Sequence, residues 1–172
     1  MFLESLNRHL QVASVVEAQR LTQLDRKFWN VVSIRGPIVV REPFTEAKRV
    51  HYAVFPDMVP DEAEDLSRAA HREDLAAIHQ FVDKIPGEPL LVHCQVGISR
   101  STAVALGIIV RTLAARNEPV EQAIDLLLQV RPKASPNEHV LQLGLELFMT
   151  PAEAKVLARR LSRHERFRTT PR

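Results

Sequence analysis

The residues best able to do chemistry are grouped in one run, residues 92–102, which reads VHCQVGISRST. The run lies where an apolar strand should end and a helix should begin, so backbone N–H groups and the positive end of the helix dipole would face one concavity. Gly97 permits the tight turn, and Arg100 in the first helical turn can offer a planar fork to two oxygens of an anion. Cys94 lies at the base of the concavity, where these positive groups would favour its thiolate. The run therefore predicts an anion site with a reactive cysteine.

A thiolate in such a site is suited to phosphoryl transfer. The sulfur of Cys94 can attack phosphorus in line with the leaving oxygen, which gives a cysteinyl-phosphate that water then hydrolyses. The transition state spreads negative charge over the equatorial oxygens, and the loop N–H groups together with Arg100 would hold that charge. Ser101 can hydrogen-bond the sulfur and ease its departure in the second step. We expect neither a metal nor a cofactor, because Arg100 and the backbone already supply positive charge.

The same run resembles the phosphate loop of the cysteine-dependent protein tyrosine phosphatase superfamily. That loop has a His-Cys pair, five further residues, an Arg and a Ser, and residues 93–101 have this pattern (HCxxGxxRS) with Gly97 at the family's glycine position. The resemblance implies that Cys94 is the nucleophile and that His93 hydrogen-bonds the loop and orients the cysteine without taking a proton. The residues expected to bind phosphate are Gln95, Val96, Gly97, Ile98, Ser99 and Arg100.

The family also needs a general acid to protonate the leaving oxygen, usually an Asp on a loop upstream of the cysteine. Asp57 directly follows a predicted strand, which resembles the family's strand–Asp–loop segment, and it is the first candidate. Asp61 is the alternative acid, although residues 61–64 (DEAE) also fit a helix-capping box. Asp65 would lie inside a helix, where a solvated carboxylate is the default.

The order of these residues along the chain selects a subfamily. Low-molecular-weight tyrosine phosphatases place their cysteine near the N-terminus with the Asp downstream, whereas Cys94 is in mid-chain with its candidate acids upstream. This order, in a compact chain, is similar to that of dual-specificity phosphatases. The turn at residues 131–137 (RPKASPN) also resembles the family's turn beside the phosphate loop. We therefore expect Asn137 to support the site, with a plain turn or a helix start equally open.

The variable positions of the loop bear on the substrate. Relatives that act on phosphoinositides or inositol phosphates usually place Lys or other charged residues there, whereas Gln95, Val96, Ile98 and Ser99 are uncharged. The loop therefore favours a singly phosphorylated group, on a protein or a small phosphomonoester. Phosphotyrosine is favoured, and phosphoserine or phosphothreonine stays open.

Two other functions stay open at this point. A catalytically weak phosphate-binding module of the same fold would keep the same loop. A rhodanese-like or Cdc25-like enzyme also uses a cysteine at the mouth of a similar loop, but it does not depend on an Asp that follows a strand. The contribution of Asp57 to the rate therefore separates that enzyme class from the phosphatase hypothesis.

The elements that must position the loop alternate between strands and helices. Short apolar runs predict strands at residues 10–13, 30–34, 50–55 and 89–93, with a short edge strand at 38–40. Helical spacing of apolar residues predicts helices at 61–84, 101–116 and 119–130. Two later helices are expected to begin at the N-caps Ser135 and Thr150, each followed by a Pro. The order predicts an α/β fold of dual-specificity-phosphatase type, with a central, mostly parallel sheet flanked by helices.

Composition and charge favour one globular domain with a basic end. Of the 172 residues, 45% are hydrophobic and 26% are charged, and the single cysteine excludes an internal disulfide framework. Residues 155–172 hold seven basic residues and one acidic residue, a net +6, whereas the other 154 hold 16 basic and 20 acidic, a net −4. We therefore expect a catalytic domain at residues 1–150 and a C-terminal helix with a basic tail at 151–172. The tail could contact an acidic partner, and no nucleic-acid partner is expected.

Neither a signal peptide nor a membrane span is recognisable. Glu4 and Arg8 interrupt what would be the apolar part of a signal peptide, and the longest apolar run, residues 102–110, is about half of what a span needs. We expect a cytoplasmic protein. The excess of Arg over Lys, 18 to 5, favours a GC-rich bacterial genome.

Overall fold

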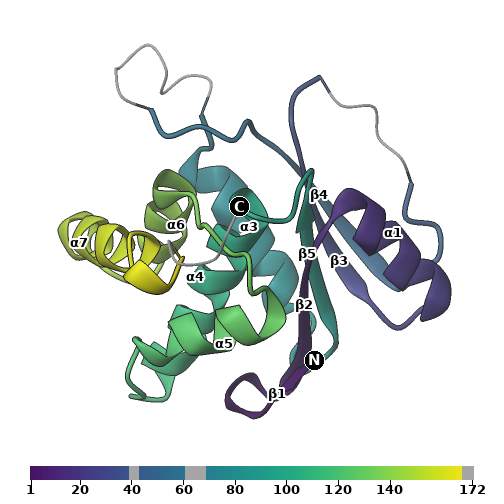
Figure 1. The fold of residues 1–172 in the computed structure, drawn as a ribbon, viewed down its shortest axis with the longest axis horizontal. Coiled ribbons are helices and arrows are strands. Elements are labelled where there is room, and N and C mark those ends of the chain that lie inside the picture. Colours follow the sequence, from purple (N-terminus) through teal and green to yellow (C-terminus); the bar gives the residue numbers. More distant parts are fainter. Residues whose placement is uncertain (39–42, 61–68, 168–172) are drawn as a thin grey trace.

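A five-stranded sheet with strand order β1-β2-β5-β3-β4 lies at the centre of the computed structural model, which describes residues 1–38, 43–60 and 69–167 (Figure 1). β2, β5, β3 and β4 run parallel, and the two-residue β1 pairs antiparallel with β2. β5 is the central strand, with Leu91 paired to Gln11 of β2 and to Val31 of β3. The strands are β1 (Phe2–Leu3), β2 (Arg8–Ser14), β3 (Asn30–Arg35), β4 (Arg49–Val54) and β5 (Leu90–Cys94).

Helices cover both faces of this sheet. α1 lies on one face, α3 to α6 lie on the other, and α7 packs against α6 at the outside (Figure 1). In the part of the chain that the structure describes, no helix is long and apolar enough to cross a membrane. The helices are α1 (Val15–Leu24), α3 (Arg72–Asp83), α4 (Arg100–Ala115), α5 (Gln122–Val130), α6 (Glu138–Leu145) and α7 (Pro151–Ser162), with 3-10 helices η1 (Glu4–Leu6) and η2 (Glu165–Phe167).

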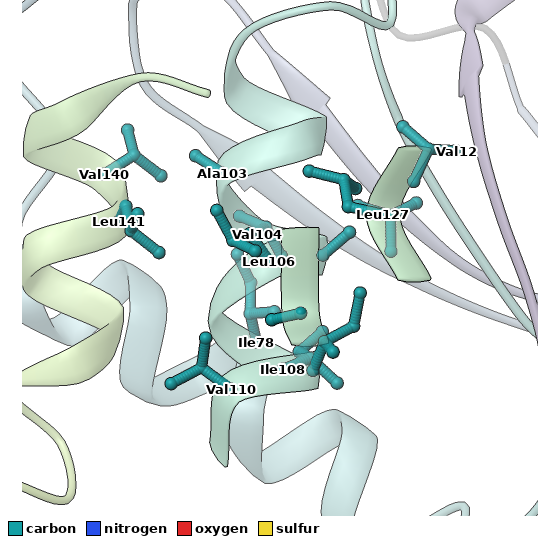
Figure 2. Packing of buried hydrophobic residues seen from close by; sticks show 14 of the residues in the cluster. Val12, Ile78, Ala103, Val104, Leu106, Ile108, Val110, Leu127, Val140 and Leu141 are labelled. Atoms are coloured by element: carbon teal, nitrogen blue, oxygen red, sulfur yellow. The ribbon is translucent and has the colours of Figure 1, made fainter. Parts of the chain in front are cut away.

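α4, the helix that follows the cysteine, is surrounded by protein. Its sequence is apolar on almost every side, as expected for a buried helix, and Ile109 and Leu113 have no exposed surface. Figure 2 shows Val140 and Leu141 of α6 on one side of α4 and Leu127 of α5 on the other. Burial of apolar surface contributes about 25 cal/mol per Å², so this packing fixes α4 and the functional residues at its N-terminus.

Alternation along β5 decides which way its last two side chains face. Leu90, Val92 and Cys94 belong to the main core with α4, because alternate residues of a strand share a face. Leu91 belongs to the smaller core beside α1. His93 lies on that second side, with its ring 4.8 Å from the ring of Phe44. The cysteine and the histidine of the motif are therefore placed on opposite faces of the sheet.

The predicted architecture is confirmed, with differences in the elements. The four predicted parallel strands, the helix after the cysteine and the final helix opened by Thr150 are present. The helix predicted from residue 61 is described only from Arg72, and Ala69 and Ala70 before it are not helical. Residues 61–68, and most of the edge strand predicted at 38–40, lie outside the described residues.

The sequence reasoning missed one helix whose signal was present. α1 follows β2 directly, and Ser14 caps it: its hydroxyl accepts from Glu17 N–H at 3.3 Å, and its own N–H donates to the Glu17 carboxylate at 2.6 Å. This reciprocal pair is a capping box, which the spacing Ser-x-x-Glu marks in the sequence. In the sequence this signal directly follows a strand-like run of apolar residues.

Candidate active site

In the backbone of residues 94–100, here called the cysteine loop, the carbonyl groups of Gln95, Val96 and Ile98 point outward, to hydrogen-bond donors outside the loop. In a planar trans peptide the following N–H points the opposite way, so the N–H groups of Val96, Gly97 and Ser99 point inward. Gly97 is the direct case, because its N–H donates to Cys94 Sγ at 3.2 Å. The outward bonds run to Gln95 O from Val15 N (3.4 Å), to Val96 O from Arg131 Nη2 (3.1 Å) and to Ile98 O from Ser135 N (2.9 Å).

Gly97 is required at the tightest point of this loop. Its φ is +77°, in the left-handed region that side chains rarely adopt. A Cβ at this position would lie 2.4–2.6 Å from backbone atoms of Ala13 and Ser14. The loop therefore passes against the end of β2 with no space for a side chain, which is how its N–H groups converge.

Cys94 ends β5 at the base of the cysteine loop. The residue is 2% exposed, and its Sγ lies 3.2 Å from Ser101 Oγ and 3.2 Å from the Gly97 nitrogen. Burial of the thiol raises its pKa, but hydrogen bonds from Ser101 and Gly97 and the charge of Arg100 outweigh that effect, so the pKa of Cys94 lies below its ordinary value. The surroundings therefore favour a thiolate at this sulfur.

His93 is buried beneath the loop as a neutral ring. Burial lowers its pKa to about 4, with Arg35 and Arg100 acting in the same direction against the hydrogen bond to Cys94 O. Its Nδ1 lies 3.3 Å from the carbonyl oxygen of Cys94. Because a neutral ring must donate to a carbonyl, Nδ1 carries the hydrogen. His93 therefore reaches the Cys94 backbone rather than its sulfur, as expected for a residue that orients the loop.

Arg100 begins α4 and reaches across to the end of β4. Its side chain is 8% exposed, and Nη1 donates to the Phe55 carbonyl oxygen at 3.0 Å. Nε is buried, and within the described residues it has no hydrogen-bond partner. Asp57 Oδ2 lies 3.8 Å from this Nε. One end of the guanidinium is thus anchored to the backbone, and the other end keeps a donor for a bound anion.

Asp57 lies two residues after Phe55, in the segment that follows β4. Its carboxylate is 38% exposed. Oδ1 accepts hydrogen bonds from Ser99 Oγ at 2.7 Å and from Asn137 Nδ2 at 2.9 Å. The structure therefore brings Asp57 together with the cysteine loop and with Arg100. The alternative acid, Asp61, lies outside the described residues.

Asn137 lies at the site, and it also corrects the predicted start of its helix. Ser135 was predicted as the N-cap, but the cap is Asn137, whose Oδ1 accepts from Val140 N–H at 3.1 Å. The Asn137 amide nitrogen donates to Asp57 and to Met58 O at 3.1 Å. The backbone N–H of Ser135 instead donates to the cysteine loop. The helix therefore begins two residues later than predicted.

One residue that supports the loop was not recognised from the sequence. Arg131 is bonded on one side to Glu17 of the α1 capping box, at 3.0 Å, and on the other to Val96 O. It therefore ties α1 and the turn before α6 to the cysteine loop. The partners lie 114 and 35 residues away, so only the fold reveals this bridge.

Comparison with known proteins identifies the family. Residues 39–146, more than half of the chain, match the sequence model of the dual specificity phosphatase catalytic domain. The chain belongs to this family. Such a domain is a phosphoric monoester hydrolase and protein phosphatase, and the matched range includes Asp57, Cys94, Arg100 and Asn137. A comparison with curated proteins gave no match.

Solved structures agree with this family at the level of the fold. The phosphatase domain of Yvh1 from Chaetomium thermophilum is 22% identical, with a TM-score of 0.60, over 84% of this chain and 93% of that one. Human DUSP28 is 23% identical, with a TM-score of 0.52, over 80% and 92%. A human tyrosine phosphatase-like serine/threonine/tyrosine-interacting protein is 19% identical, with a TM-score of 0.55, over 84% and 87%.

Proposed function

We propose that this protein hydrolyses phosphomonoesters on proteins through a cysteinyl-phosphate intermediate. The observation that carries the proposal is that three groups lie together at the start of α4. The Cys94 sulfur is held by Gly97 N–H and Ser101 Oγ, Arg100 keeps a buried Nε donor, and Asp57 Oδ2 lies 3.8 Å from that donor. A nucleophile, an anion clamp and an acid are the parts that this reaction needs.

In the first step the Cys94 thiolate attacks phosphorus. The S–P bond forms as the P–O ester bond breaks, and the electron pair of the broken bond goes to the leaving oxygen. Asp57 gives that oxygen a proton. Arg100 and the inward N–H groups hold the three equatorial oxygens, whose charge increases in the transition state.

In the second step water attacks the phosphorus of the cysteinyl-phosphate and gives its proton to the Asp57 carboxylate. The S–P bond breaks, and its electron pair returns to Cys94 as a thiolate, which leaves inorganic phosphate. Ser101 Oγ, 3.2 Å from the sulfur, stabilises the departing thiolate. Asp57 is thereby protonated again for the next cycle.

The substrate that fits best is a singly phosphorylated phenol, as in phosphotyrosine. The side chains between Cys94 and Arg100 carry no charge that would recognise a second phosphate. Val96 is 57% exposed on the loop, and Val59, two residues after Asp57, is 50% exposed. These apolar surfaces suit the ring of a phosphotyrosine better than the polar backbone around a phosphoserine. Phosphoserine and phosphothreonine are the second choice.

Residues 1–150 are the catalytic unit in this proposal, and 151–172 are an extension of it. All the site residues and the family match lie before residue 151. In the extension, Arg160 pairs with Glu121 and Arg163 with Glu138, both at 2.7 Å. Part of its positive charge is thus already neutralised by the body, and a contact with an acidic partner would use the rest. A reducing compartment such as the cytoplasm fits an enzyme that needs its only cysteine reduced.

Hydrolysis of an aryl phosphate by the wild type and two variants tests the proposal. Cys94→Ser should lower the rate by more than about 10³-fold, and Arg100→Lys by about 10²-fold because the planar fork is lost. Arg159→Lys, at an exposed position of α7, is the matched control and should leave the rate unchanged.

The outcomes separate the candidate functions. If the wild type binds phosphate but gives no turnover above background, the protein is a phosphate-binding module. Turnover that survives Cys94→Ser would exclude the covalent mechanism. A panel of phosphopeptides then ranks phosphotyrosine against phosphoserine and phosphothreonine, and equal rates would contradict the substrate choice.

A further inference from the structure

The two carboxylate oxygens of Asp57 have different surroundings. Oδ1 accepts two hydrogen bonds, from Ser99 Oγ at 2.7 Å and from Asn137 Nδ2 at 2.9 Å. Oδ2 faces the guanidinium of Arg100, whose Nε lies 3.8 Å away. This Nε has no hydrogen-bond partner among the described residues. One oxygen is therefore held by protein donors, and the other faces the group that binds phosphate.

The orientation of the Asn137 amide is fixed by the helix that it caps. Its Oδ1 accepts from Val140 N–H at the start of α6, so its nitrogen must be on the opposite side. That nitrogen has two hydrogens, and they go to Asp57 Oδ1 and to Met58 O. A flipped amide would lose all three bonds. Asn137 is therefore a donor toward Asp57 and cannot act as an acceptor for it.

The Ser99 hydroxyl also donates its hydrogen bond to Asp57. Ser99 occupies the N-cap position of α4, where a serine commonly caps the helix with its side chain, but it makes no such bond here. Its hydroxyl instead donates to Asp57, 42 residues away in the chain. The last position of the cysteine loop before Arg100 thus contacts the candidate acid directly.

We propose that Ser99 and Asn137 are positioning residues that direct the acidic proton of Asp57 to Oδ2. An oxygen that already accepts two donors has no free direction for a proton of its own, so protonation of Asp57 takes place at Oδ2. That oxygen faces Arg100 and hence the bound phosphate ester, so the proton is aimed at the leaving oxygen. The inference rests on the proposed role of Asp57 as general acid.

The arrangement also couples the acid to the assembly of the loop. Asn137 begins α6, and Ser135 just before it holds Ile98 O of the cysteine loop at 2.9 Å. The same turn therefore fixes the nucleophile loop through its backbone and the acid through its side chain. Asp57 is held in place only where the cysteine loop and the α6 cap are both formed.

Three variants separate this role from a structural one. Ser99→Ala removes the first donor, and Asn137→Ser removes the second donor while keeping a residue that caps helices well. Ser99→Thr keeps the hydroxyl and is the rescue control. Each is assayed on aryl phosphates with good and poor leaving groups, alone and combined with Asp57→Asn, and thermal unfolding confirms that each variant is folded.

We expect a loss of about 10-fold to 10²-fold for Ser99→Ala and for Asn137→Ser on poor leaving groups, because misplacement of a catalytic group by about 1 Å costs up to that much. The loss should be much smaller on good leaving groups, which do not need the proton, and Ser99→Thr should recover most of the rate. In the Asp57→Asn background both effects should disappear, since residues that act through the same group are not additive.

Two results would overturn the inference, and they are distinguishable from failure of the proposed function. Equal losses on good and poor leaving groups, or full additivity with Asp57→Asn, would mean that Ser99 and Asn137 act only on the loop or on folding. A flat response to Asp57→Asn itself would instead remove Asp57 as the acid, and the proposed function would have to be revised before its positioning residues are considered.

Discussion

The cysteine loop and the segment that carries Asp57 are built in opposite ways. The loop is a continuous run in which one strand ends and one helix begins, and most of the bonds that hold its shape end on its own backbone atoms. Asp57 lies in a segment outside any helix or strand, and the bonds on its carboxylate come from side chains 42 and 80 residues away. The proposed nucleophile is thus held through the backbone of its loop, whereas the proposed acid is held through its side chain.

This difference has consequences for mutation. Bonds that end on the loop's own backbone atoms are not removed by changing side chains of the loop, so damage from within the cysteine loop requires a steric change. The position of Asp57 depends on individual hydroxyl and amide groups, so it can be altered one bond at a time. Few substitutions in the loop should therefore lower the rate, but those that do should lower it strongly. Several substitutions around Asp57 should each lower the rate by a smaller amount.

The largest effect is expected for Gly97→Ala. A Cβ 2.4–2.6 Å from the backbone of Ala13 and Ser14 must displace either the loop or β2, and the left-handed φ adds its own cost. We expect a loss of stability of about 3 kcal/mol and a fall in rate of more than about 10³-fold, equal for good and poor leaving groups. Urea unfolding and aryl phosphate kinetics measure the two. Near-normal activity would mean that the loop is not held as described.

Asp57→Asn should have the next largest effect, and one of a different kind. Removing the acid should lower the rate by about 10² to 10³-fold for poor leaving groups and much less for good ones. Stability should change little, because the carboxylate is partly exposed. The dependence of rate on the acidity of the leaving phenol is the measurement, and a slope that is unchanged from the wild type would exclude this Asp.

Ser101→Ala should have a smaller effect, largest in the second step. The loss of the hydroxyl 3.2 Å from Cys94 Sγ makes the thiolate a poorer leaving group. We expect turnover to fall about 10-fold, while the initial release of phenol stays fast, so a burst should appear in stopped-flow traces. Slow initial release of phenol, without accumulation of the cysteinyl-phosphate, would instead place the role of Ser101 in the first step.

The protonation of His93, beneath the loop, should have the smallest effect at neutral pH. Its effect is on the free energy of unfolding. Burial lowers the pKa of His93, and of His79 elsewhere in the core, to about 4. Because the unfolded chain binds the proton at higher pH than the folded chain, stability is complete above pH 6.5 and is lost as pH falls toward 4. Each histidine should cost about 2 kcal/mol between pH 7 and pH 5.

Urea unfolding at the two pH values measures this loss. His93→Asn and His79→Asn should each remove a similar share of the pH dependence, and His79, whose ring lies 3.0 Å from Arg111 Nη1, is the matched control. Stability that is equal at pH 7 and pH 5 would show that these rings are protonated in the folded state.

The sequence was informative where neighbours in the chain are neighbours in space. Cys94, Gly97 and Arg100 could be predicted together because one strand–loop–helix junction positions all three. For Asp57 against Asp61 the sequence left a choice, since the partners that hold the acid are distant in the chain. The start of α6 shows the same limit. Ser135 and Asn137 are both residue types that cap helices, so the local sequence does not decide between them. In the structure Asn137 is the cap, and it is also the residue bonded to the segment of Asp57.

The central claim is that phosphate passes through the sulfur of Cys94. Rapid mixing with an aryl phosphate, followed by an acid quench, digestion and mass spectrometry, tests it most directly. We predict phosphate on the Cys94 peptide during turnover, more of it in Ser101→Ala, and none in Cys94→Ser. Sustained turnover of the wild type with no phosphate on Cys94 at any quench time, in Ser101→Ala as well, would contradict the account.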